Sequence, residues 1–311
     1  QMALKNLRKV VFLKIESVYG TDPVPVAGTD ALLVHNFSCT PLEIIYAERN
    51  NALPFLGNQG QIKAGDSVKM EFDIEAAGAG AVAGTPGFGA AMKGCALSET
   101  LTPTTGPMTY APISTAEQSV TAYFYWDGLL HKMSGARGTT SLKMSKGGIP
   151  MIHFAFTGLY GGITDVSLPS PTLTAFQKPL AVNKANTTFT LHTYAAVLAD
   201  LSFDQGNTMS YVNLPNSEEV RFTDRKSRGS VTIELPLIAG KDFFTIIRAE
   251  TTGALALVQG TAAGNKFKLD APAVQLTNPR YSEADGVAML QMGMEFLPTS
   301  AGNDEFTYKT I

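Results

Sequence analysis

The chain has 311 residues, enough for about two domains with cores of their own. Charged residues make up only 16% of it, below the ~25% of typical soluble proteins, so we expect much of the surface to meet other protein. The net charge of −3 argues against a protein that grips nucleic-acid backbones, which would carry an excess of basic residues.

Period-two alternation, which is typical of half-buried strands, dominates the regular parts of the chain. In the strand predicted over 67–75, one face would carry Val68, Met70, Phe72 and Ile74, and the other Lys69, Glu71, Asp73 and Glu75. Asp127-Gly128 favours a hairpin turn between strands 120–126 and 129–133. Lys146-Gly147-Gly148 favours a second hairpin between strands 140–144 and 149–156.

Helical periodicity is scarce and predicts one helix in each half. Residues 88–99 can place Phe88, Met92, Cys95 and Ala96 on one face. Residues 242–252 have similar spacing, with Asp242 as the N-cap.

The same order of signals occurs twice, which predicts a duplication. The first half runs through strand 31–34, polar segment 46–65, strand 67–75, the helix, and paired strands ending near Leu159. The second runs through 195–198, polar segment 207–229, strand 230–235, the helix, and strands 266–269, 274–277 and 287–296. We expect a first domain over 1–165 with an N-terminal arm, a Pro-rich linker over 166–185, and a second domain over 186–311 with a C-terminal arm.

The residues that could carry chemistry match no known constellation. The glycine-rich stretch 78–84 lies between a strand and a helix but lacks the spacing of a phosphate-binding loop, so a flexible connection is expected there. Cys39 and Cys95 have no metal-site spacing, and the four histidines form no ligand pair. The basic cluster 224–229 lies near Glu218 and Glu219, which favours salt bridges between subunits over nucleic-acid binding. We expect no catalytic, cofactor or metal site.

Several segments resemble the major tail tube proteins of long, non-contractile-tailed bacteriophages. The most specific is 123–138 (YFYWDGLLHKMSGARG), and the others are 16–23, 39–43, 53–57, 88–100, 147–150 and 154–160. The resemblance covers about residues 11–165, and the second half shares only the order of elements. It implies an all-β fold, a barrel-forming β-sandwich with one flanking helix in each of two tandem tube-like domains.

The resemblance also implies an assembly, in which inner strands close a β-barrel lumen and rings stack into a tube. Joining sheets edge to edge would remove the exposed strand edges of an all-β subunit. Because each chain would carry two tube domains, a ring of six domains needs three chains, a trimeric pseudo-hexamer.

Two sets of residues become candidates for assembly. In the family an extended loop reaches the next ring, so the charged residues of the two polar segments are candidate inter-ring contacts: Glu48, Arg49, Lys63, Asp66, Glu218, Glu219, Arg221, Arg225 and Arg228. Strand residues that point away from the core are candidates to line the lumen: Lys69, Glu71, Asp73, Glu75, Thr232 and Glu234.

The partners implied are further copies of the chain, a tape measure protein in the lumen, and tail terminator and distal tail proteins at the ends. Genomic DNA would pass without sequence-specific binding, because a phosphate-binding lumen would trap it. We expect a virion tail component assembled in the bacterial cytoplasm, with no membrane binding by this subunit. The alternative is a carbohydrate- or receptor-binding β-sandwich module of a virion or cell surface, and an enzyme is disfavoured because no site constellation supports it.

Overall fold

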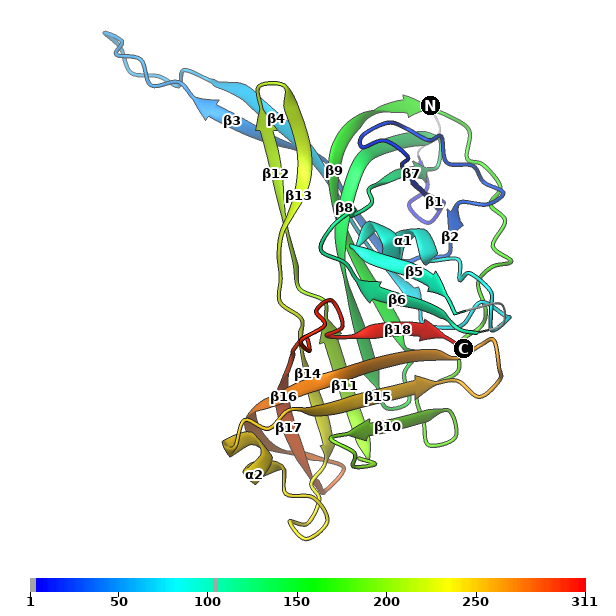
Figure 1. Cartoon of the computed structure of the whole chain (residues 1–311). Coiled ribbons are helices and arrows are strands. Elements are labelled where there is room, and N and C mark those ends of the chain that lie inside the picture. Colours follow the sequence, from blue (N-terminus) through cyan, green and yellow to red (C-terminus); the bar gives the residue numbers. More distant parts are fainter. Residues whose placement is uncertain (1–3, 103–105) are drawn as a thin grey trace.

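The regular structure of the described residues consists of antiparallel strands and one short helix in each half (Figure 1). The computed structural model describes residues 4–102 and 106–311. The expected all-β class is therefore confirmed.

The first half runs through β9. Its elements are β1 (Lys9–Ile15), β2 (Ala31–Leu32), β3 (His35–Glu48), β4 (Gln61–Glu75), α1 (Gly89–Gly94), β5 (Leu97–Leu101), β6 (Met108–Pro112), β7 (Val120–Trp126), β8 (Leu129–Ser145) and β9 (Met151–Asp165).

The second half follows an extended connection. Its elements are β10 (Thr187–Leu191), β11 (Leu198–Asp204), β12 (Asn207–Leu214), β13 (Ser217–Arg225), β14 (Arg228–Glu234), α2 (Phe243–Arg248), β15 (Gly253–Gln259), β16 (Phe267–Ala284), β17 (Val287–Phe296) and β18 (Thr307–Thr310).

The alternation predicted for residues 67–75 is confirmed in β4. The four apolar side chains of one face are at most 2% exposed, while Lys69 and Glu71 on the other face are exposed. The turn between β7 and β8 is also confirmed: Asp127 (φ 43°) and Gly128 (φ 111°) both have positive φ, which this dipeptide tolerates.

Both predicted helices are too long. The first covers only Gly89–Gly94, because Ala96 takes a positive φ of 56° and Leu97 then enters β5, which pairs with β6. The second covers Phe243–Arg248; its N-cap is confirmed, since the Asp242 side chain accepts a hydrogen bond from the Thr245 amide.

Two strand boundaries also differ from expectation. The strands expected over 266–269 and 274–277 are one long strand, β16, which begins at Phe267 and has a bulge between Thr277 and Arg280. The strands expected over 129–133 and 140–144 are likewise one strand, β8, which continues through Gly135 and Gly138. Glycine at 138 fits the close approach of the neighbouring strand, since a Cβ there would lie 2.6 Å from the Ala155 carbonyl oxygen.

Strand pairing follows the same order in both halves. The first half pairs as β1–β7–β8–β9–β4–β3, and the second as β10–β15–β16–β17–β14–β11. The halves join where Ser141–Ser145 of β8 pair antiparallel with Asp200–Asp204 of β11. Eight strands therefore form one continuous surface, β3–β4–β9–β8–β11–β14–β17–β16, which we call the central sheet.

One face of the central sheet packs on the core. A single cluster of buried residues spans both halves, with Phe72 stacked against Phe154 and Phe156 in the first and Phe203 packed among Phe296, Phe306 and Tyr308 in the second. We call the opposite side of the central sheet the open face.

The glycine-rich stretch 78–84 makes a packed contact between the halves. The Gly80 amide donates to the Gly264 carbonyl oxygen at 2.8 Å, and a Cβ at Gly78 would lie 2.3 Å from that oxygen. Glycine at this place allows the close approach of two backbones, which explains the composition without a ligand.

Candidate assembly surfaces

The first candidate inter-ring segment is the tip of a long hairpin. Strands β3 and β4 stay paired out to Glu48 and Gln61, and residues 49–60 form the loop that projects at the upper left of Figure 1. Glu48 and Arg49 lie where the loop begins. The loop carries apolar side chains with no cover in the subunit, since Phe55 is 67% and Leu56 103% exposed. We call residues 43–66 the first arm.

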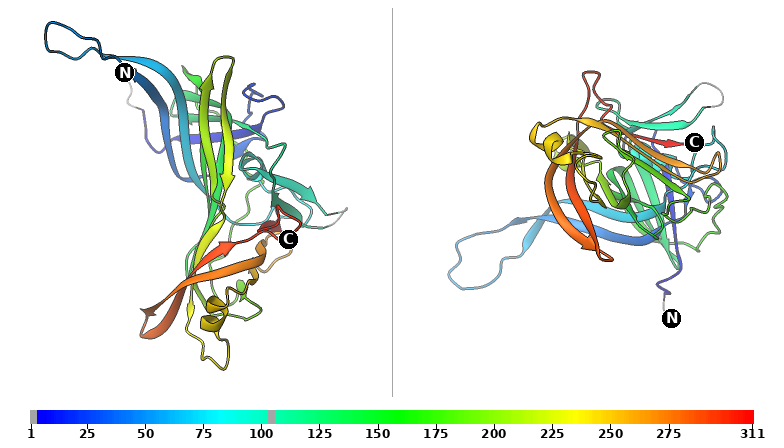
Figure 2. Two further views of the ribbon diagram at one scale, coloured as in Figure 1. Left: turned by 60° about the vertical axis from the view of Figure 1, so that its left-hand side comes forward. Right: turned by 90° about the horizontal axis from the view of Figure 1, so that it is seen from below.

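The second polar segment, expected as a loop, is mostly a two-stranded hairpin. Pairs run from Asn207–Arg225 to Leu214–Ser217, and Asn216 makes the turn with a φ of 70°. We call residues 207–225 the second arm. Both arms project toward the same end of the molecule (Figures 1 and 2).

The two arms touch through one tyrosine. The Asp66 amide of the first arm donates to the Tyr211 hydroxyl oxygen at 3.2 Å, and this hydroxyl donates to the Glu218 carboxylate at 2.5 Å. Lys63 pairs with Asp66 at 2.7 Å. The structure thus brings together Lys63, Asp66 and Glu218 from opposite halves of the sequence.

The remaining candidates of the second arm divide into surface and internal groups. Glu219 and Arg221 pair on β13, and the hydrogen bond from Arg221 lowers the pKa of Glu219. Arg225 is turned inward: its guanidinium binds Glu305 and the Ile113 carbonyl oxygen, and its side chain is only 15% exposed. Arg225 therefore fastens the C-terminal segment and has little surface for a second ring.

All six lumen candidates lie on the open face of the central sheet. Lys69, Glu71, Asp73 and Glu75 alternate with the buried side of β4, and Thr232 and Glu234 do so on β14. Arg228, expected in the arm, also lies at this face, where its backbone pairs with Glu295 of β17.

Neighbouring strands add further charged side chains to the open face, beyond those expected from the sequence. Acidic side chains outnumber basic ones: the acidic members are Glu43, Glu71, Asp73, Glu75, Asp200, Asp204, Glu234 and Glu295, and the basic members Lys69, Arg137, Lys143, Arg228 and Arg280. Sequence alternation could have identified Asp200 and Asp204 as outward-pointing, because they alternate with Ala199, Leu201 and Phe203, which are all buried.

Both outer edges of the central sheet are unpaired within the described part of the chain. Strand β3 pairs with β4 alone. Strand β16 pairs with β15 and β18 through its first residues, but its last residues, 280–284, pair only with β17. Each edge therefore presents backbone donors and acceptors without a strand partner.

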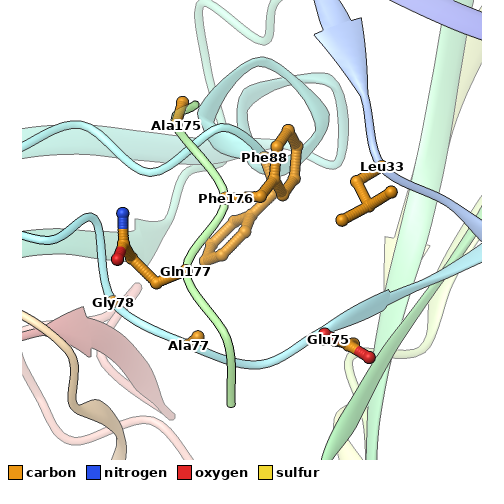
Figure 3. A pocket seen from close by; sticks show the side chains of 8 residues that line it. All are labelled: Leu33, Glu75, Ala77, Gly78, Phe88, Ala175, Phe176 and Gln177. Atoms are coloured by element: carbon orange, nitrogen blue, oxygen red, sulfur yellow. The ribbon is translucent and has the colours of Figure 1, made fainter. Parts of the chain in front are cut away.

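Within residues 4–102 and 106–311 the side chains that could ligate a metal or act as a nucleophile are scattered. No cluster of three or more His, Cys, Asp or Glu side chains could hold a metal ion. The cavity in Figure 3, between Phe88, Phe176 and Glu75, has a volume of about 10 Å³, room for one water molecule at most. Both cysteines are free, and burial raises the pKa of Cys39 to about 12, which makes it a poor nucleophile.

The described helices are also too short to cross a lipid bilayer.

Comparison with known proteins identifies one family. A family model described as phage tail tube protein matches residues 6–295, nearly the whole chain. No curated protein matches the sequence.

Proposed function

The chain belongs to the phage tail tube protein family, and on this premise we propose that it polymerises as stacked rings whose bore conducts DNA into the host. Membership makes it a structural component of the virion tail, assembled in the host cell. The observation that carries the ring is the central sheet, because it ends in two unpaired edges that a neighbouring copy can cover.

Each ring contains three chains in this proposal. The repeated pairing order supports two tube domains, 1–165 and 186–311, joined by the linker 166–185. Three central sheets would close a barrel of twenty-four strands. At ~4.8 Å between strands and a tilt of ~40°, that barrel is roughly 48 Å across at the backbone, a wide channel.

The open face forms the wall of this channel. Its acidic excess repels phosphate, so DNA passes without being held. In the same scheme a tape measure protein occupies the bore before ejection, tail terminator and distal tail proteins cap the two ends, and the subunit carries out no catalysis.

The two arms make the contacts between rings. They project to one end of the subunit, as successive rings along an axis require. The exposed apolar loop of the first arm gives each ring a surface that only another protein can cover.

Electron microscopy of the purified protein over a concentration series tests the assembly. We expect hollow, striated tubes or rings, and image symmetry gives three chains and six domains per ring. Six chains per ring would contradict the trimer, and dispersed particles at every concentration, with or without purified tail-tip proteins as initiator, would contradict the tube.

Reversing charge on the open face should convert the channel into a DNA-binding surface. We expect tubes of Glu71→Lys/Glu234→Lys to retain duplex DNA in co-sedimentation at low salt and to release it at high salt, because added lysines bind phosphates through counterion release. The matched control, Glu117→Lys/Glu250→Lys, adds the same charge away from the central sheet. Equal retention by both variants would show that the open face does not line the bore.

A further inference from the structure

Each half of the central sheet contains rows of directly opposed residues, and the rows of one half can be matched to those of the other. One row of directly opposed residues crosses each half: Ser38, Glu71, Ala155 and Thr139 in the first, and Ser202, Ser230, Gly293 and Thr277 in the second. The rows correspond because β4 and β14 each end four residues later, at Glu75 and Glu234. Both rows also begin with serine and end with threonine.

The chain already joins the two halves at the pairing of β8 with β11, the strands equivalent to β16 and β3. We call this pairing the internal joint. Within it, Ser202 of β11 lies opposite Lys143 of β8. This joint is well packed, since Leu142 and Phe203, one from each strand, are both 1% exposed.

The row equivalence identifies the counterparts of this joint at the free edges. Ser38 of β3 corresponds to Ser202. In the first half, Lys143 lies in the row of Met151 and Glu75. In the second half, the row that ends at Glu234 contains Met289 and Ser282. Ser282 of β16 therefore corresponds to Lys143.

The equivalent residues at the free edges are exposed to solvent, whereas the core-facing side chains of the joint between β8 and β11 are buried. Tyr281 corresponds to Leu142 but is 70% exposed, and Ser38 and Ser282 are both exposed. The bulge between Thr277 and Arg280 adds one residue to β16, which is why Ser282 lies five residues after Thr277 while Lys143 lies four after Thr139.

We infer that β16 of one copy pairs antiparallel with β3 of the next, with Ser282 opposite Ser38, in the register that joins β8 to β11 within the chain. Tyr281 then lies opposite Cys39 of the neighbour, and both are covered. The partner of each free edge is a second copy of the chain, because the proposed pairing repeats between copies the pairing that β8 and β11 make within one chain. This inference rests on the proposed ring.

A pair of engineered cysteines tests the register. In tubes of Ser38→Cys/Ser282→Cys we expect disulfides between copies under mild oxidation and, for a closed ring, covalent trimers on a non-reducing gel. Directly opposed residues have Cβ atoms ~4.5–5.5 Å apart, close to disulfide geometry, while diagonal neighbours lie ~7–8 Å apart. Each single variant should stay monomeric on the gel.

The matched control is Ser38→Cys/Arg280→Cys, whose second cysteine lies on the same face two residues away. Tubes in which this control links and the Ser282 pair does not would overturn the register and leave the tube intact. Tubes in which neither pair links would overturn the β3–β16 joint, whereas wild-type protein that never forms tubes would overturn the proposed function.

Hydrogen exchange of the wild-type protein supplies a second measurement that needs no variant. Assembly should slow exchange at least tenfold in both 36–40 and 280–284. Unchanged exchange in either segment of assembled tubes would contradict the joint.

Discussion

Removing residues 50–62 should leave a folded subunit that no longer makes tubes. The deletion joins Arg49 to Lys63, so Ala47, Glu48 and Arg49 become a three-residue loop between Tyr46 and Lys63, which already pair. No core residue is lost, because the removed segment is exposed except for the partly buried Gln59. We expect an unfolding midpoint within a few degrees of wild type by circular dichroism, and no tubes by electron microscopy.

A substitution of the same loop separates its length from its chemistry. Leu53→Ser/Phe55→Ser/Leu56→Ser keeps the backbone and removes the exposed apolar side chains. If these side chains are buried against the next ring, polymerisation should need at least tenfold more protein. Normal tubes from the deletion variant would exclude the first arm as a contact between rings.

Replacing Glu16 by alanine should destabilise the subunit more than any surface change. The Glu16 carboxylate is 6% exposed and accepts four hydrogen bonds of 2.6–2.7 Å, from the Gly20 and Gly135 amides and the Ser119 and Thr121 hydroxyls. Glu16→Ala leaves these donors without their acceptor, at a cost of at least about 3 kcal/mol. Urea unfolding of the monomer, followed by fluorescence of Trp126, measures the loss.

Two comparisons identify the cause. Glu71→Ala removes a carboxylate from the exposed side of β4 and should change the free energy of unfolding by less than about 0.5 kcal/mol. Adding Ser119→Ala and Thr121→Val to Glu16→Ala removes two of the orphaned donors and should recover part of the loss. Equal stability of Glu16→Ala and Glu71→Ala would contradict the role of the buried carboxylate.

Sequence alone predicted the strands that bury one whole side and missed a hairpin whose two sides are both only partly buried. The alternation of Val68, Met70, Phe72 and Ile74 was visible because one face meets the core. Residues 207–229 were expected to be a polar segment without strands, because neither face of the hairpin over 207–225 is fully buried and the sequence shows no apolar period there. Its strands are held by mutual pairing, by the turn at Asn216, and by contacts of Asn207 and Val220 with the first half of the chain.

The sequence identified individual residues of the candidate surfaces but not which of them lie side by side. Alternation gave the correct side of β4 and β14, yet it could not show that these sides share one face with Asp200 of β11. That neighbourhood depends on the pairing of β8 with β11, residues more than fifty positions apart, which no local pattern encodes. The same gap hid the inward path of Arg225, whose partner Glu305 lies in the C-terminal segment.

The joint between β8 and β11, one of the six seams between neighbouring domains in the proposed ring, also changes how the ring would assemble. A ring of six separate domains must form every seam between free molecules, and each association loses translational and rotational freedom at an estimated 4–15 kcal/mol. Here every second seam of the proposed ring is made when the chain folds, so three seams between chains remain instead of six, and a ring needs two associations of free molecules instead of five. Such a ring needs a lower protein concentration to nucleate, and under force it should part first at the seams that join different chains.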